Sequence, residues 1–209
     1  MRFIITGIVI LMLGAGFSCS REKSTSQYCK EFAQGKTEHI GILVSRKARG
    51  CFQEHLYHPL PAVREHSIKG FSETHSTGDY SSLHNAVADN YYSVSLAAAR
   101  ILAKTQIYEH IQPVINGLSS RKAPIRRACI YALLESKNKK HILKIAGFLN
   151  DASPEVRMAS ALYLTAFSAV EHLNLLKQSL SGETDTHTYN VKNRCIKILQ
   201  DLNGNNDNR

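Results

Sequence analysis

Residues 149–164 read Leu-Asn-Asp-Ala-Ser-Pro-Glu-Val-Arg-Met-Ala-Ser-Ala-Leu-Tyr-Leu, and this stretch decides the fold. Its polar turn ends in Ser153-Pro154, where a serine favours a helix cap and a proline suits the first helical turn. From Val156 onward, apolar side chains recur with the spacing of one helical face. The stretch therefore predicts a turn followed by an amphipathic helix.

The same pattern recurs along the chain in three columns. Aliphatic anchors follow one another at intervals of 31, 31, 31 and 35 residues: Val63, Val94, Ile125, Val156 and Val191. Four residues after each anchor the side chain is small (Ser67, Ala98, Cys129, Ser160, Cys195), and eight residues after it is large and apolar (Phe71, Leu102, Leu133, Leu164, Leu199). A fixed period near 30 residues predicts stacked repeats, each too small to bury its apolar face alone.

Each repeat is expected to hold two antiparallel helices. Before the turn at 150–155, Ile142, Ile145, Ala146 and Leu149 keep helical spacing and indicate a first helix. The second helix starts near the anchor. Its small column is expected to let the two helices approach closely, and its large column to fill the groove between them.

The motif Leu149-Asn150-Asp151-x-Ser153-Pro154-x-Val156-Arg157-x-Ala159 resembles the short HEAT repeat, including the type found in bilin lyases. This resemblance covers about residues 40–202 and implies an all-α fold, a right-handed α-solenoid of about five HEAT-like helical hairpins. In that family the turn aspartate and the arginine commonly form a ladder between repeats. Asp151 and Arg157 match both positions, but Asp89 faces Ser95, and Arg64 and Arg126 match only the arginine. We therefore expect an interrupted ladder.

The N-terminus is expected to carry an export signal. A positive start, Met1–Arg2, precedes an apolar run from Phe3 to Phe17, which is short for a membrane span and suits a signal peptide. The sequence Ala15-Gly16-Phe17-Ser18-Cys19 resembles the bacterial lipoprotein signal, although glycine stands where leucine is usual. The resemblance implies cleavage before Cys19, lipidation of Cys19 and attachment to the inner or outer membrane, on the periplasmic side or the cell surface. A plain secretory signal or an uncleaved anchor are the alternatives.

The predicted organisation follows from these signals. Residues 1–18 form the signal peptide, 19–27 a lipidated tether, 28–203 the HEAT-like repeat domain and 204–209 a disordered tail. Helical spacing over 40–56 predicts a capping element, either one long helix or a helix with a bend, after a short helix over 26–35.

Four cysteines remain after Cys19. Cys129 and Cys195 share the small column two repeats apart, roughly 20 Å by helix-packing distances. A disulfide needs Cα atoms within about 7 Å, so these two cysteines should not be bonded to each other. A Cys29–Cys51 bond across an N-terminal helical hairpin is possible, and the sequence leaves it open.

The chain is basic, with a formal charge of +9. Such a balance often indicates nucleic acid, but the export signal argues against it and leaves anionic lipids, envelope polymers or acidic proteins. Basic residues crowd one stretch: Arg121, Lys122, Arg126, Arg127, Lys137, Lys139, Lys140 and Lys144. From this stretch Arg121, Lys122, Arg126 and Arg127, together with Arg157, are the candidate partner-binding residues. The alternative is an ordinary solvated surface.

No catalytic residue, metal ligand or cofactor is predicted, because the chain lacks a phosphate loop, a nucleophile elbow, a Cys-x-x-Cys pair and a His-Glu-x-x-His helix. His110, His141 and His172 recur every 31 residues, but at roughly 10 Å per repeat they cannot share one ion. The turn at 181–190 carries a four-residue insertion, whose Glu183, Asp185 and His187 indicate either a solvated loop or a cation contact.

These observations favour a non-catalytic, monomeric cell-envelope lipoprotein that holds another envelope protein on its repeat surface and binds no nucleic acid. The alternative is a bilin-lyase-like or other small-ligand-binding HEAT enzyme, or an enzyme accessory. A scaffold predicts a broad, shallow surface, whereas the alternative predicts a deep apolar groove lined by polar groups.

Overall fold

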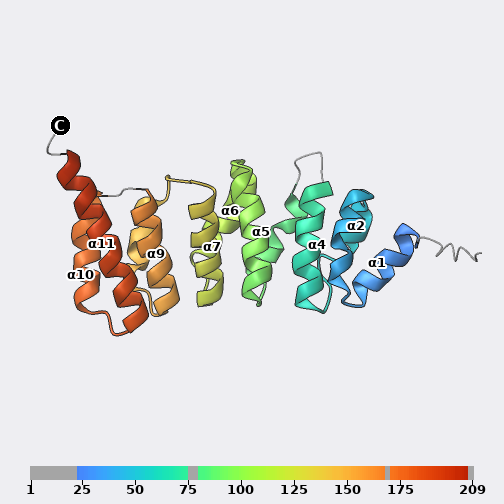
Figure 1. Ribbon diagram of the computed structural model, residues 1–209, viewed down its shortest axis with the longest axis horizontal. Coiled ribbons are helices and arrows are strands. Elements are labelled where there is room, and N and C mark those ends of the chain that lie inside the picture. The colour runs from blue at the N-terminus through green and yellow to red at the C-terminus, as the bar shows by residue number, and fades with distance from the viewer. Residues whose placement is uncertain (1–22, 75–79, 168–169, 207–209) are drawn as a thin grey trace, which may run out of the picture.

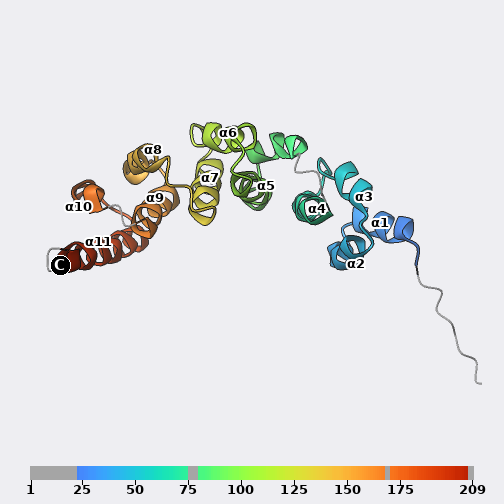
Figure 2. The same cartoon turned by 90° about the horizontal axis from the view of Figure 1, so that it is seen from above.

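The protein is a curved row of helical hairpins, and Figure 2 shows the curvature. The computed structural model describes residues 23–74, 80–167 and 170–206, and all regular structure in these ranges is helical. The inner side of the curve is lined by the second helix of every repeat: α4 (Pro61–Thr74), α5 (Tyr92–Lys104), α7 (Ala123–Glu135), α9 (Pro154–Ala166) and α11 (Thr186–Asn206). The predicted all-α solenoid is confirmed.

The first helices are shorter and lie on the outer, convex side (Figure 2). They are α6 (Tyr108–Gly117), α8 (Ile142–Ala146) with the 3₁₀ turn η4 (Gly147–Asn150), and α10 (Leu173–Ser181) after η5 (Val170–His172). In the second repeat two 3₁₀ turns, η2 (Ser81–Leu83) and η3 (Asn85–Ala88), replace the expected helix. Short 3₁₀ pieces suffice there because the apolar residues Leu83, Ala86 and Val87 still reach the core.

The three sequence columns form the core. All members of the small and large columns are buried, and so is every anchor except the half-buried Val191. The small column does bring helices close: a Cβ on Gly117 of α6 would lie 2.4 Å from the Cys129 sulfur of α7. Cys129 and Cys195 are buried free thiols, as predicted, and burial raises the pKa of Cys129 to about 12.

A cap of short helices covers the N-terminal end: α1 (Thr25–Ala33), η1 (Thr37–His39), α2 (Ile40–Ser45) and α3 (Arg49–Glu54). The disulfide that the sequence left open joins Cys29 of α1 to Cys51 of α3, with their Cα atoms 5.9 Å apart. The stretch over 40–56 is broken rather than continuous, because Lys47 is left-handed (φ 51°) and the Ala48 N–H donates to the Leu43 carbonyl at 2.9 Å. This is the usual hydrogen bonding of a helix C-terminus.

The ends of the helical domain differ from the predicted boundaries by a few residues. Helix α1 begins at Thr25, inside the predicted tether, and α11 continues to Asn206, inside the predicted tail. The predicted signal peptide and Cys19 lie outside the described residues. Within the described ranges, every helix is too short or too polar to cross a bilayer.

Candidate interaction surface

A ladder of ion pairs joins neighbouring repeats along the edge where first and second helices meet. Each rung pairs the arginine after one anchor with the turn acid of the next repeat. Arg64 Nε lies 2.8 Å from Asp89 Oδ2, Arg126 Nε lies 2.8 Å from Asp151 Oδ2, and Arg157 Nε lies 2.8 Å from Glu183 Oε2. All three arginines also donate through Nη1 to two carbonyls of their own turn. These bidentate pairs fix the angle between successive repeats.

The ladder is interrupted between the second and third repeats, as the sequence predicts. Serines stand at both positions there: Ser95 donates to the Val87 carbonyl at 2.6 Å, and Ser120 accepts from the Lys122 N–H at 3.2 Å. No ion pair forms between Ser95 and Ser120, and each hydroxyl instead bonds to a backbone group of its own repeat.

The insertion in the last repeat supplies the final rung, so the prediction of a solvated loop is wrong for Glu183. Its carboxylate has no exposed surface and contacts two cationic side chains, Arg157 and Lys192, with the Lys192 ammonium 2.9 Å away. Hydrogen bonding from Arg157, and then from Lys192, lowers the pKa of Glu183 to about 2. Asp185 of the same insertion accepts the Thr188 N–H at 2.7 Å and so caps α11.

Lys192 is a buried cation of the ladder that the sequence did not predict. It is fully buried, and its ammonium also donates to the Leu149 and Ser179 carbonyls, both at 3.0 Å. It follows the anchor Val191 directly, which is the position that arginine holds in three other repeats. Because α11 is the last described helix, the Lys192 ammonium pairs with the acid of its own repeat. The position of Lys192 directly after an anchor, where other repeats have arginine, is the sequence signal that predicts its role.

The ladder divides the predicted partner-binding residues into two groups. Arg126 and Arg157 have side chains only 13% and 14% exposed, and their guanidinium groups form ion pairs within the chain. Arg121 and Lys122 are exposed at the turn edge, where Lys122 Nζ donates to Asn90 Oδ1. Arg127 lies on the other side of α7, on the concave face.

The concave face is formed by the residues two and six positions after each anchor. On a helix these positions point away from the small column four positions after the anchor, which faces the first helix. In the outer repeats they carry Glu65 and Lys69, or Asn193 and Lys197, which are polar. The three middle repeats instead place there the buried Leu96 and five partly exposed residues: Arg100, Arg127, Tyr131, Met158 and Leu162. These six residues, with Tyr92, are called the central concave surface below.

Arg127 is the centre of this surface. Its guanidinium carbon lies 3.8 Å from the centroid of the Tyr92 ring, a cation–π contact between α7 and α5. Burial raises the pKa of the neighbouring Tyr131 phenol. Arg100 pairs with Glu135 across the same two helices. The buried Nε atoms of Arg100 and Arg127 have no hydrogen-bond partner among the described residues.

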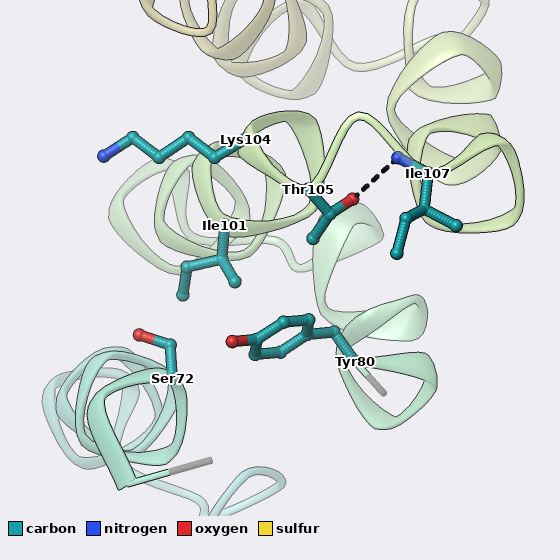
Figure 3. A pocket seen from close by; sticks show the side chains of 6 residues that line it. All are labelled: Ser72, Tyr80, Ile101, Lys104, Thr105 and Ile107. Carbon is teal, nitrogen blue, oxygen red and sulfur yellow. Dashed lines mark hydrogen bonds between the residues drawn. The ribbon is translucent and has the colours of Figure 1, made fainter. Parts of the chain in front are cut away.

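Hollows of up to about 460 Å³ lie between neighbouring repeats. One of about 450 Å³ lies between the first two repeats and is lined by Ser72, Tyr80, Ile101, Lys104, Thr105 and Ile107. Figure 3 shows the Tyr80 hydroxyl pointing toward Ser72 below Ile101, while the Ser72 hydroxyl points away from Tyr80 and the Lys104 side chain extends above Ile101. A smaller hollow of about 180 Å³ lies beside Arg127, between Tyr92 and Glu155.

The histidine column does not converge on a common site. His110 and His172 are buried, and His141 precedes α8, where burial lowers its pKa. His110 contacts His84 of the preceding repeat, with 3.1 Å between ring nitrogens. Among the described residues, one group places three potential metal ligands within 4.8 Å of one another: Cys29, Cys51 and His55. The two sulfurs of that group are bonded to each other.

Comparison with known proteins supports a HEAT-repeat protein. Residues 111–190 match the family model of HEAT repeats. Among solved structures, the chain is similar to an engineered protein from the Northeast Structural Genomics Consortium, with 15% identity, a TM-score of 0.51, and coverage of 87% of this chain and 93% of that chain. At this identity the likeness shows the fold alone. No match was found among curated proteins.

Proposed function

We propose that this HEAT-repeat chain is a non-catalytic scaffold that holds another protein on its central concave surface. The observation that carries the proposal is the change in chemistry along the concave columns, from polar residues in the end repeats to arginine, tyrosine, methionine and leucine in the middle three. Arginine, aromatic residues and methionine are the types enriched at protein interfaces and at their energetic hot spots.

The ladder supports the same proposal by fixing the shape of the surface. A partner that spans several repeats binds best to a surface whose repeats are already held at a fixed angle, because less freedom is lost on binding. The ion pairs Arg64–Asp89, Arg126–Asp151 and Arg157–Glu183 supply that rigidity. In this proposal Arg126 and Arg157 position the surface, while Arg127 contacts the partner.

We also propose that the scaffold is a monomer anchored to the bacterial envelope through a lipid on Cys19. The signal-like sequence at residues 1–19 supports this, and the Cys29–Cys51 bond agrees with an oxidising compartment. Radiolabelled palmitate should enter the protein in growing cells and should not enter the Cys19→Ala variant. Equal incorporation in both would overturn the anchor.

Partner binding is tested by quantitative capture from the native envelope with matched variants. Tyr131→Ala should lower the amount of captured partner about tenfold or more, because truncating a hot-spot tyrosine typically costs about 2 kcal/mol of binding free energy. Tyr189→Ala, which truncates an exposed tyrosine of α11, is the control and should leave capture unchanged. If both variants capture equally, the central concave surface is not the docking surface.

A second candidate is a small-ligand-binding protein of the bilin-lyase kind, and one observation favours it. The hollow of about 450 Å³ combines apolar walls at Ile101 and Ile107 with hydroxyls from Ser72 and Tyr80 and an ammonium from Lys104. Native mass spectrometry of the protein purified from its own cells decides between the two. A bound small molecule that is lost in Ile101→Ala would favour the second candidate.

A further inference from the structure

The positive charge of the chain is concentrated in its middle. Between residues 100 and 144 the sequence holds ten basic residues and two acidic ones, against a formal balance of +9 for the whole chain. The ladder neutralises Arg126, and Arg100 pairs with Glu135. Lys137, Lys139 and Lys140 lie in or beside the connection from α7 to α8, and no described carboxylate forms an ion pair with them.

This charge adjoins exposed apolar side chains. The second helices run parallel, so the connections that follow α5 and α7 leave the array at one edge (Figure 1). Ile107, in the connection after α5, and Tyr108, the first residue of α6, are 43% and 70% exposed. We define the basic edge as Lys104, Ile107, Tyr108, Lys137, Lys139 and Lys140.

Four members of the basic edge line two hollows. Lys104 and Ile107 line the hollow of Figure 3, while Tyr108 and Lys140 line a second hollow of about 260 Å³. The Gln106 amide donates to the Ser136 carbonyl at 3.2 Å and so ties the two connections together. The two connections that carry the basic edge therefore lie side by side on adjacent repeats.

We propose that the basic edge lies on the surface of an anionic phospholipid bilayer. Lysines next to an exposed tyrosine and isoleucine match the chemistry of an interface, where ammonium groups meet lipid phosphates and the aromatic ring sits at headgroup depth. The acyl group proposed at Cys19 is a separate attachment, and the edge acts without it. Contact at this edge leaves the concave surface open to a partner.

The first test is vesicle binding by the chain from residue 19 with Cys19→Ala, which keeps every described helix and lacks the acyl group. It should sediment with vesicles of phosphatidylcholine containing about one quarter phosphatidylglycerol, and should not sediment with phosphatidylcholine alone. Lys139→Gln with Lys140→Gln should lower the partition coefficient roughly 25-fold, since each lysine near such a surface contributes about fivefold. Lys177→Gln with Lys197→Gln removes the same charge from exposed positions of the last repeat and should have little effect.

The second test asks whether the edge enters the headgroup region. The sequence contains no tryptophan, so one introduced tryptophan reports on its own site. The Tyr108→Trp variant should shift its emission to the blue when the anionic vesicles are added, whereas the Tyr189→Trp variant, altered at an exposed position of α11, should not.

Three results would overturn the proposal. The control lysine pair could weaken binding as much as the test pair, which would mean that only net charge matters. The emission of the Tyr108→Trp variant could stay unchanged on vesicle binding, or shift no more than that of the Tyr189→Trp variant. The chain could bind polyglutamate in solution but neither type of vesicle, which would assign the edge to an acidic protein. None of these tests uses the partner of the concave surface, so they are independent of the proposed function.

Discussion

Replacing Glu183 by glutamine should remove more stability than any other single hydrogen-bonding change in the last repeat. The carboxylate has no exposed surface, accepts from Arg157 and Lys192, and accepts the Asp185 N–H at 3.1 Å. Glutamine keeps the shape but leaves the fully buried Lys192 ammonium without its counter-charge. Removing one partner of a buried ion pair costs about 3–5 kcal/mol, because the other charge stays buried.

Urea unfolding followed by far-UV circular dichroism measures this loss, with hydrogen exchange showing which repeats open first. Amides of α10 and α11 should lose protection in Glu183→Gln, while those of α5 should keep it. Glu171→Gln is the matched control, because the Glu171 side chain is 66% exposed and its change should stay within about 0.5 kcal/mol.

A second substitution makes the explanation specific. In the Glu183→Gln background, Lys192→Met removes the stranded cation and should recover part of the lost stability, since an apolar side chain of similar length suits the same buried site. If Glu183→Gln costs less than about 1 kcal/mol, or if Lys192→Met adds a further full loss, the buried ion pair is not what holds the last repeat.

Three further predictions concern acid, a close approach at Gly70 and the disulfide. Acid should destabilise the protein as pH falls from about 4.5 toward 2, because the Glu183 pKa is lowered to about 2 in the folded protein and the stability gained from its ionised form is lost over this range. In Glu183→Gln the urea midpoint should fall less over the same range. The remaining fall should come from groups such as Glu31, whose pKa is lowered to about 2 chiefly by Lys23. Gly70→Ala should cost about 1–3 kcal/mol in urea unfolding, because its Cβ would lie 2.4 Å from the Phe52 ring, whereas Gly147→Ala, with no atom within 4 Å of the new Cβ, should be neutral or slightly stabilising. The double variant Cys29→Ala with Cys51→Ala removes a bond that closes a separation of 22 residues and should cost about 3 kcal/mol of stability. Hydrogen exchange should rise in α1 while α9 stays protected. Unchanged exchange in α1 would contradict the role of the disulfide in holding the cap.

The columns of the sequence predicted the core because each column occupies the same packing environment in every repeat. A side chain such as Ala98 or Ser160 is small for the same geometric reason in every repeat, so the regularity itself carries the information. The first helix of the second repeat escaped prediction because 3₁₀ turns bury the same apolar residues as a helix does. A bend was one of two alternatives predicted over 40–56, but its position at Lys47 was not, because a left-handed lysine has no clear signature in the sequence.

The candidate site was predicted less well because charge in a sequence does not show what each charge faces. Arg126 and Arg127 are adjacent in the chain, yet Arg126 is held in the ladder by Asp151 and Arg127 lies over Tyr92 on the concave face. Only the helical register, counted from the anchor Ile125, separates the two roles. The same count places Lys192 in the arginine column and Tyr131 on the concave face.

Site-specific photo-crosslinking in intact cells tests the central claim most directly. A photoreactive residue placed at Tyr131, on the concave face, should capture a partner protein as a discrete product. The same residue placed at Leu143, on the convex side and 81% exposed, is the matched control and should not capture that partner. Capture from Leu143 but not from Tyr131 would contradict the account.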